Sequence, residues 1–315
     1  MLNKACFVAG TPVLLEDDSL ESIECLTIGA DVRSWTDSVA AHESHDEFPA
    51  TGPGDWRVYQ LAMNDVEDNP VSVALLRPAD WLEHTQNALR AAPRADKRAA
   101  ARQETHAWTG AIVHLELPEL GLDGPARVIG VEPCPPQVTV ARGGFVSGTI
   151  ARQADATLRI RVDATHDVIE TTASHPFWSA TRGGWTRAGN LLVGEALTTH
   201  EGATHVTSID LGPPNTVYNI EVFDDHTYFV GQAQAWVHNS CPIPKFTRAM
   251  KARAFRIASG TEIDKVNTLV QKFGGRKGSW RKMKTWTDDN AEIHYYEHHG
   301  IGVVGAKWAG DPDPF

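Results

Sequence analysis

The segment Val237-His238-Asn239-Ser240-Cys241 places the strongest constraint on this chain, because its chemistry works only if the fold holds it rigidly. The side-chain amide of Asn239 can attack the residue's own backbone carbonyl, which closes a five-membered succinimide and breaks the following peptide bond. This attack is intramolecular, so orientation supplies much of the rate and no cofactor is required. We expect His238 to polarise the strained carbonyl. Alone, such a tripeptide is usually an ordinary turn, so the interpretation depends on other segments.

Two further segments carry groups suited to peptide-bond chemistry. Near the N-terminus, the thiol of Cys6 can attack the carbonyl of Ala5 in an N-to-S acyl shift, because a thiol is a good nucleophile at neutral pH. Thr172–Trp178 contains a T-x-x-H pattern, in which we expect Thr172 to orient the Ala5–Cys6 bond and His175 to protonate the departing amide nitrogen. Taken singly, His175 is more often a plain loop histidine.

The segment Val217–Val230 supplies a fourth element. Its apolar and polar residues alternate as in a strand, and His226 stands at the predicted turn. We expect His226 to relay a proton to or from the side-chain amide of Asn239.

The order of these segments (Cys start, T-x-x-H, strand with His, His-Asn end) resembles that of self-cleaving Hint (hedgehog/intein) domains. It looks most like the pretoxin Hint domains that precede C-terminal toxins in bacterial polymorphic toxin systems. The resemblance covers about residues 1–36 and 150–239 and implies a mainly β, horseshoe-like fold that needs neither cofactor nor metal. It implies cleavage after Asn239, and Ser240 formally meets the requirement for splicing. Asn219 departs from the family, which often carries Asp there.

The segments Ser22–Val32 and Ala188–Leu197 are alike in sequence, and they predict an internal repeat of the kind the resemblance implies. Each contains an apolar element, a glycine turn and the start of a new strand. Aligning Gly29 with Gly194 superposes three apolar pairs: Leu26 with Leu191, Ile28 with Val193 and Val32 with Leu197.

Length and charge predict two domains. A chain of 315 residues allows about two, which we place at 1–239 (Hint, with an insertion at about 40–110) and 240–315. Residues 240–315 hold 13 basic and 8 acidic side chains, a net charge of +5, whereas the other 239 residues hold 16 and 32, a net of −16. The charge of the C-terminal domain is suited to binding a polyanion; the alternatives are that it binds an acidic protein or is simply a solvated basic domain.

Other features narrow the setting. The four cysteines form no C-x-x-C pair, so neither a disulfide scaffold nor a zinc site is expected, and Cys25 and Cys134 read as inert thiols. No apolar stretch approaches the roughly 18–20 residues of a membrane-spanning helix. The resemblance implies a bacterial protein made in the cytoplasm, with its toxin portion delivered by a secretion system to the cytoplasm of a neighbouring cell.

The insertion at about 40–110 is predicted to be a structural elaboration, partly helical. Val58–Leu61 and Val71–Leu76 read as strands, and Ala79–Trp108 has helical composition. It is too short for a homing endonuclease and lacks an acidic metal motif. His42 and His45 have no neighbouring ligands, so an exposed loop is expected rather than a metal site.

The C-terminal domain is predicted to be α+β. Lys245–Ser259 and Thr261–Phe273 read as helices, the second with Thr261 as N-cap and an end at Gly274. Three strand-like segments follow: Trp280–Trp286, Glu292–His298 and Ile301–Trp308. This order resembles the small bacterial toxin ribonucleases of the barnase, colicin and RelE type, through outline and composition rather than a motif.

The strand-like segments contain the groups that metal-free RNA cleavage uses: a base, an acid and phosphate-binding cations. The acid and base candidates are His294, Glu297, His298 and His299. The cationic candidates are Lys282 and Lys284, with Arg281 beside them. The aromatic residues Trp280, Trp286, Tyr295 and Tyr296 can stack bases, or can simply fill a small core.

Two functions stay open for this domain. One is a ribonuclease acting on RNA and neutralised by an acidic immunity protein. The other is a toxin without nuclease activity, or a partner-binding module. A zinc deaminase is disfavoured because its H-x-E and C-x-x-C signature is absent, and an HNH nuclease because no helix with a late histidine follows His298 and His299.

Overall fold

The computed structural model describes residues 5–35, 53–65, 68–84, 108–117, 120–138, 144–163, 168–223, 225–239, 248–286, 292–300 and 302–308. The chain divides into two compact units, each described here by itself. The β unit comprises Lys4–Leu115 and Leu122–Cys241, and the C-terminal unit is mainly Pro242–Phe315. Ser240 lies outside the described residues, as do His42 and His45.

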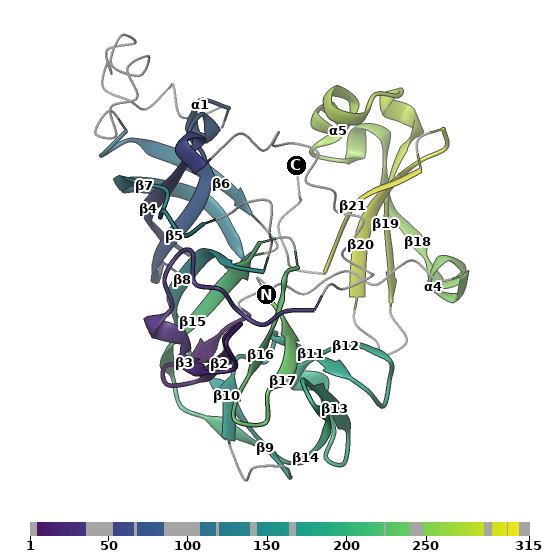
Figure 1. The fold of residues 1–315 in the computed structure, drawn as a ribbon. Coiled ribbons are helices and arrows are strands. Elements are labelled where there is room, and N and C mark those ends of the chain that lie inside the picture. Colours follow the sequence, from purple (N-terminus) through teal and green to yellow (C-terminus); the bar gives the residue numbers. More distant parts are fainter. Residues whose placement is uncertain are drawn as a thin grey trace. The chain divides into compact units, whose positions relative to one another are not determined.

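The β unit is built of antiparallel strands (Figure 1). Its strands are β1 (Phe7–Val8), β2 (Pro12–Leu14), β3 (Leu20–Ser22), β4 (Trp56–Asn64), β5 (Pro70–Pro78), β6 (Ile112–Leu117), β7 (Leu122–Pro133), β8 (Val146–Ala154), β9 (Thr157–Val162), β10 (Val168–Thr171), β11 (Pro176–Ser179), β12 (Gly184–Arg187), β13 (Ala196–Thr199), β14 (Gly202–Gly212), β15 (Asn215–Val222), β16 (Thr227–Val230) and β17 (Ala235–His238). The only described helices here are one-turn segments: η1 (Ile23–Cys25), η2 (Pro53–Asp55), α1 (Trp81–His84) and η4 (Ala188–Asn190). The mainly β prediction is therefore confirmed.

The insertion is part of this sheet rather than an appendage. The two predicted strands form and extend beyond the predicted bounds, as β4 and β5. Strand β5 pairs with β8, and β8 pairs along β15. Of the predicted helical stretch 79–108, only α1 is described as helix, and residues 85–107 lie outside the described part.

The predicted internal repeat is confirmed. Turns η1 and η4 each end in an extended leucine, Leu26 and Leu191, whose N–H groups donate to Ile23 O at 3.4 Å and Ala188 O at 3.3 Å. Gly29 and Gly194 follow with φ of 90° and 87°, which a side chain with a Cβ would strain.

Matching hydrogen bonds extend the repeat to a candidate residue. Ile23 N–H donates to Thr11 O at 2.9 Å, and Ala188 N–H donates to His175 O at 2.8 Å. Each acceptor precedes a proline that opens a strand, β2 or β11. His175 therefore occupies in one half the position that Thr11 occupies in the other.

The C-terminal unit contains a four-stranded antiparallel sheet in the order β18-β19-β20-β21. Its elements are α4 (Arg248–Arg253), β18 (Phe255–Ser259), η5 (Gly260–Glu262), α5 (Val266–Phe273), η6 (Lys277–Ser279), β19 (Trp280–Trp286), β20 (Glu292–His298) and β21 (Gly302–Trp308). The three predicted strands are confirmed almost residue for residue.

The helix predictions in this unit need correction. The segment Phe255–Ser259 is strand β18, paired with β19, so the predicted helix Lys245–Ser259 is wrong over these residues. Thr261 lies in η5 and does not cap α5; the capping box belongs to Ser259 and Glu262. Gly274 ends α5 as predicted, with φ of 81°.

A small apolar core holds the unit together. Helix α5 supplies Val266 and Leu269, which cluster with Trp280 and Tyr296 of the sheet. Trp280 is fully buried, and its indole N–H donates to Gly274 O at 3.1 Å, so this aromatic residue belongs to the core. No helix among the residues described is long and apolar enough to span a membrane.

Candidate functional site

Strand pairing in the β unit brings the four reactive segments together. Strand β1, which follows Cys6, lies between β10 and β15, with Phe7 opposite Thr171 and Tyr218. Strand β17 ends at His238 and pairs with β16, where Thr227 lies opposite His238. The cysteine, the T-x-x-H segment, the turn at His226 and the His-Asn pair thus belong to adjoining strand ends.

The Cys6 end is held by backbone and threonine contacts. Cys6 is fully buried, and its N–H donates to Thr172 Oγ1 at 3.0 Å. Thr172 N–H donates in return to Cys6 O at 2.9 Å. The hydroxyl of Thr171 also donates to Cys6 O, at 2.8 Å, and the sequence analysis did not select it. The predicted partner Thr172 therefore contacts the nitrogen of the Ala5–Cys6 bond directly.

His175 lies in an apolar pocket next to these residues. Its ring is 4.0 Å from the ring of Phe7, centroid to centroid, and the residue is fully buried. Neither ring nitrogen has a hydrogen-bond partner in the part of the chain that the structure describes. Burial, and then the charge of His238, lower the pKa of His175 well below its ordinary value. The imidazole is therefore neutral at physiological pH.

The predicted cleavage residue is buried at the end of β17. Asn239 is 1% exposed, and its N–H donates to His226 O at 2.8 Å. The side-chain nitrogen, Asn239 Nδ2, lies 3.5 Å from His226 Nδ1. His226 adopts φ of 56°, which is uncommon for a residue with a side chain and aims this ring from a tight turn. The two residues are thus close enough for proton transfer with a small adjustment.

The carbonyl of Asn239 has a donor that the sequence analysis did not assign to catalysis. Asn219 Nδ2 donates to Asn239 O at 2.7 Å. Tyr228 OH in turn donates to Asn219 Oδ1 at 2.9 Å. Asn219 is 3% exposed within a β-strand. A polar residue in the middle of a predicted strand is the feature of the sequence that could have identified it, because a buried polar side chain needs a hydrogen-bond partner.

His238, predicted to polarise that carbonyl, is buried beside it in the chain. Its ring lies 5.2 Å from the ring of Trp185 and runs nearly parallel to that of His226 at 6.2 Å. The two imidazoles therefore lie near one another at the strand end.

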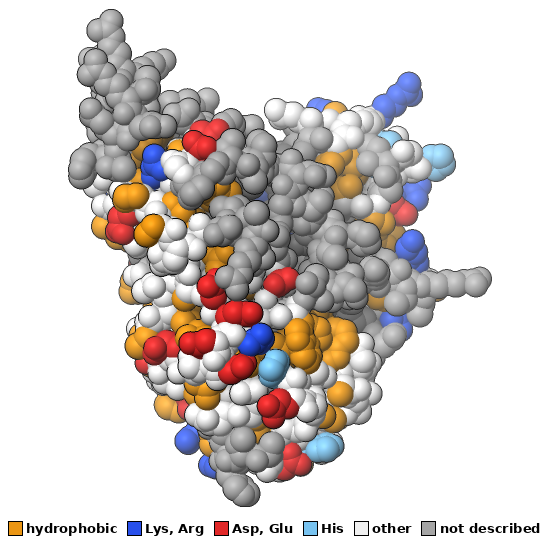
Figure 2. Space-filling model, viewed as in Figure 1, with side chains coloured by type: hydrophobic (Ala, Val, Ile, Leu, Met, Phe, Trp, Pro, Cys, Tyr) orange, Lys and Arg blue, Asp and Glu red, His pale blue; other side chains and the backbone are white. Residues whose placement is uncertain are grey.

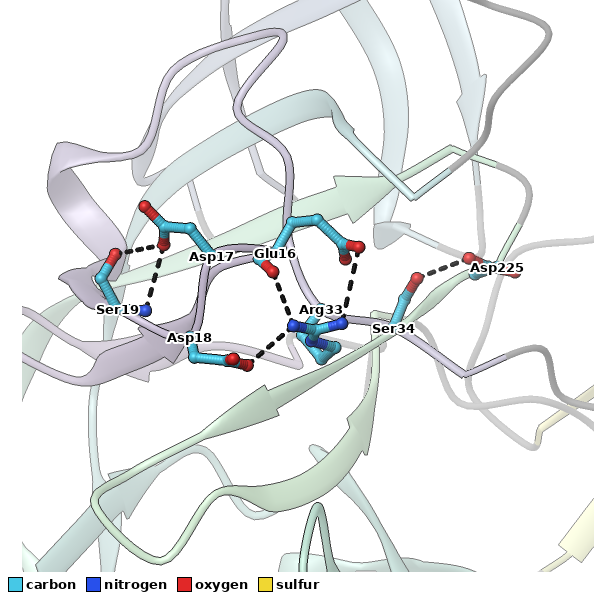
Figure 3. A network of polar contacts seen from close by, with 7 residues as sticks. All are labelled: Glu16, Asp17, Asp18, Ser19, Arg33, Ser34 and Asp225. Atoms are coloured by element: carbon cyan, nitrogen blue, oxygen red, sulfur yellow. Dashed lines mark hydrogen bonds and ion pairs between the residues drawn. The ribbon is translucent and has the colours of Figure 1, made fainter.

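The turn that carries His226 is tied to the segment leading into the insertion, and Figure 3 draws the contacts of Ser34 with Asp225 and of Arg33 with Asp18. Ser34 Oγ donates to Asp225 Oδ2 at 2.5 Å, and Trp35 N–H donates to Thr227 Oγ1 at 3.2 Å. Arg33 anchors this segment through an ion pair with Asp18 at 2.7 Å. The residues on both sides of His226 are therefore tied to one short stretch.

The C-terminal unit separates its candidates between the two faces of the sheet. In β20, His294 lies opposite Lys284 of β19, and Lys282 lies opposite Tyr296, so both lysines share a face with His294. Glu297 lies opposite Arg281 on the other face, so it is not gathered with His294. These pairings divide the predicted acid and base group.

Two further candidates lie at the far end of β20. The ring of His298 packs 5.0 Å from that of Trp280, and its Nδ1 accepts the N–H of Gly300 at 3.1 Å. His299 is exposed after the strand end. His298 thus has a packing role on the core side of the sheet.

A polar cluster that includes Glu292 surrounds His294. His294 Nε2 lies 2.7 Å from Glu292 Oε1, and Lys284 Nζ lies 3.3 Å from Glu292 Oε2. The hydrogen bond from His294 and contacts with Lys284 lower the pKa of Glu292, which favours a carboxylate facing both groups. Lys284 also lies 5.1 Å from the rings of Phe255 and Trp286. The sequence analysis did not select Glu292.

Among the residues described, no group of three or more His, Cys, Asp or Glu side chains could hold a metal ion. In Figure 2, acidic side chains are prominent on the visible face of the β unit, in keeping with its negative net charge.

Residues 140–240 match a family model described as Pretoxin HINT domain. This stretch resembles a Hint domain. It includes Thr172, His175, His226 and the His238–Ser240 segment, whereas Cys6 lies outside it. The match supports a Hint self-cleaving domain and does not extend to the C-terminal unit.

Several inteins are similar in structure. The bacterial intein-like domain from Clostridium thermocellum is 20% identical, with 74% of this chain and 98% of that chain covered and a TM-score of 0.36. The TvoVMA intein is 13% identical, with 75% and 99% covered and a TM-score of 0.36. No curated protein sequence matches the chain.

Proposed function

We propose that the β unit cleaves its own chain between Asn239 and Ser240 by cyclisation of Asn239. The observation that carries the proposal is the 3.5 Å distance between Asn239 Nδ2 and His226 Nδ1 at a buried strand end. The family match over residues 140–240 supports it independently.

In the proposed step, the amide nitrogen of Asn239 gives a proton to His226 and forms a bond to its own backbone carbonyl carbon. The carbonyl is polarised by His238, and the bond to the nitrogen of Ser240 then breaks as that nitrogen takes up the proton that His226 received and relays. The products are a chain that ends in a succinimide and a chain that begins with a free amine. No water is consumed, so the two products together have the composition of the precursor.

The N-terminal reaction is proposed as a separate step. The thiol of Cys6 gives its proton to the neutral His175 as the sulfur attacks the carbonyl carbon of Ala5, and His175 passes that proton to the nitrogen of Cys6 as the bond between Ala5 and Cys6 breaks. The 3.0 Å hydrogen bond from Cys6 N–H to Thr172 favours this, because it orients the nitrogen that departs. Whether Ser240 goes on to accept the acyl group decides between cleavage and splicing.

Time-resolved mass spectrometry tests the main proposal. We expect full-length chain from cell-free synthesis to release a fragment beginning at Ser240. The matching N-terminal fragment should be lighter by one water than a hydrolysis product. Asn239→Ala should stay intact, and equal release from both chains would refute the proposal.

We propose that the released C-terminal unit is a ribonuclease toxin. The cluster of Glu292, His294 and Lys284 supports it: a carboxylate at 2.7 Å orients the imidazole, and a cation lies beside both. In this proposal His294 takes the 2′-hydroxyl proton of RNA, and Lys284, with Lys282 on the same face, binds the phosphate. The other candidates, Glu297, His298 and His299, are proposed only as surrounding groups.

Expression of the full chain in bacteria tests the ribonuclease proposal. We expect growth arrest with loss of RNA, abolished by His294→Ala and weakened by Glu292→Gln. Glu297→Gln, on the opposite face of the same strand, is the matched control and should stay toxic. Arrest without loss of RNA would favour the alternative, a toxin or partner-binding module without nuclease activity.

The setting follows from the pretoxin match and stays a proposal. We propose that the protein is synthesised in a bacterial cytoplasm and that a secretion system delivers its toxin portion to a neighbouring cell. We also propose that an acidic immunity protein neutralises the toxin. The net charge of +5 on residues 240–315 favours an acidic partner.

A further inference from the structure

A neutral side chain holds the carbonyl at which the proposed cyclisation occurs. Asn219 Nδ2 donates to Asn239 O at 2.7 Å, and the two residues are 3% and 1% exposed. We propose that Asn219 is the catalytic oxyanion donor for cleavage after Asn239, and that Tyr228 is its positioning residue. This inference rests on the proposed function of the β unit and names a group in the reaction that the His-Asn motif does not supply.

The chemistry of the contacts fixes which way the Asn219 amide points. The carbonyl of Asn239 can only accept, so the NH₂ group of Asn219 must face it. The opposite amide orientation would bring two acceptor oxygens together. The hydroxyl of Tyr228 then donates to Asn219 Oδ1 at 2.9 Å and holds the side chain in this orientation.

This donor points at the atom where charge develops. When Asn239 Nδ2 attacks, the backbone carbonyl oxygen becomes an oxyanion in a buried site, where a preorganised hydrogen bond is more effective than in water. Burial, and then the charge of Cys6, raise the pKa of Tyr228 well above its ordinary value. The hydroxyl therefore stays protonated, and the amide stays fixed across the working pH range.

Because the side chain of Asn219 is neutral, we expect cleavage after Asn239 not to depend on the reaction at Cys6. An aspartate here would place a carboxylate oxygen about where Nδ2 now lies, against a carbonyl that is becoming negative. Such a residue would assist only when protonated. The amide of Asn219 needs no proton from another step, so cleavage after Asn239 can proceed whether or not Cys6 has reacted.

The test uses the full chain, pulse-labelled during cell-free synthesis, with release of the Ser240 fragment followed over time. We expect Asn219→Ala to slow release roughly 10²–10³-fold, the range seen when one oxyanion donor is removed. Tyr228→Phe, which removes only the hydroxyl, should slow it less. The matched controls are Asn215→Ala, an exposed position on the same strand, and Tyr218→Phe; both should release at the wild-type rate.

A pH series on Asn219→Asp separates catalysis from folding. If the side chain acts as an oxyanion donor, release from this variant should be fastest in acid and fall as the carboxyl group ionises. Because ionisation of a buried carboxyl group can also destabilise the fold, hydrogen-exchange protection of the β15 amides is measured at each pH, and release should fall at pH values where that protection is unchanged. Wild-type rates from Asn219→Ala, or a pH profile for Asn219→Asp identical to wild type, would overturn the inference. Failure of the wild-type chain to release the fragment would instead refute the proposed function itself.

Discussion

A buried ion pair between the insertion and the strand of Asn219 gives a quantitative test of how the site is supported. Arg77 of β5 contacts Glu221 of β15 through two nitrogen–oxygen pairs, each at 2.9 Å, and both side chains are 12% exposed. Ser147 Oγ also donates to Glu221 Oε2 at 2.9 Å. Burial raises the pKa of Glu221, but the charge of Arg77 and these hydrogen bonds together bring it below its ordinary value.

Arg77→Met should destabilise the β unit substantially. Removing one partner of a buried pair leaves an uncompensated charge and costs about 3–5 kcal/mol. Each charge-assisted hydrogen bond is worth about 1.5–3 kcal/mol, so the loss of two is consistent with that range. The double variant Arg77→Met, Glu221→Met should recover most of the loss, because it leaves no buried charge behind.

The sign of the pH dependence follows from the lowered pKa of Glu221. In the wild type, the stability from this pair is present above the unfolded pKa, near 4.5, and is lost as pH falls through the folded value. In Arg77→Met the buried carboxyl group lacks its cation, so its pKa rises. The variant's deficit should therefore be largest at neutral pH and shrink in acid, where Glu221 is protonated.

Hydrogen exchange of the β15 amides measures this in the uncleaved Asn239→Ala background. A loss of about 3–5 kcal/mol corresponds to exchange roughly 10²–10⁴-fold faster. The control is Arg159→Met, because Arg159 contacts Glu170 at 3.4 Å while 46% exposed, and such pairs contribute about 0–1 kcal/mol. If Arg77→Met changed exchange no more than Arg159→Met, the buried-pair reasoning would be wrong.

Three further outcomes are expected. Cys6→Ala should still release the Ser240 fragment in the time course, because no atom of Cys6 takes part in the cyclisation. The pKa of His175 is lowered from 6.5, so the stability of the β unit should decrease as pH falls below 6.5, by at most about 1.4 kcal/mol per pH unit. His175→Asn should flatten that slope in acid unfolding curves, and an unchanged slope would contradict this assignment to His175. Trp280→Ala, which empties the centre of the small core, should cost the C-terminal unit about 3–5 kcal/mol, measured by exchange of the β19 and β20 amides.

Local sequence patterns predicted the turns and strands whose conformation depends mainly on their own residues. The glycine turns at Gly29 and Gly194 were predictable because each requires a positive φ, and both halves of the repeat follow from them. The strands β19 and β20 follow from alternation and a polar turn between them.

Local patterns did not predict a strand whose conformation depends on its pairing partner. Phe255–Ser259 continues a basic, alanine-containing stretch that favours a helix, yet it forms β18 because the edge of β19 is available to pair with it. The position of Glu292 beside His294, in contrast, was accessible from the sequence, because residues two apart in the predicted strand Glu292–His298 share a face. At β18, a non-local contact outweighs composition.

Asn219 shows how burial points to a candidate functional residue that a motif comparison treats as a deviation. A polar side chain at 3% exposure within a strand must have partners, and its two partners here are the reacting carbonyl and a fixed hydroxyl. Since the nearby His175 is held neutral and Tyr228 stays protonated, the immediate donors around the strand end carry no charge of their own. In the proposed step the negative charge on Asn239 O develops together with a positive charge on His226, and an oriented neutral amide would stabilise the oxyanion without competing for the proton that His226 takes.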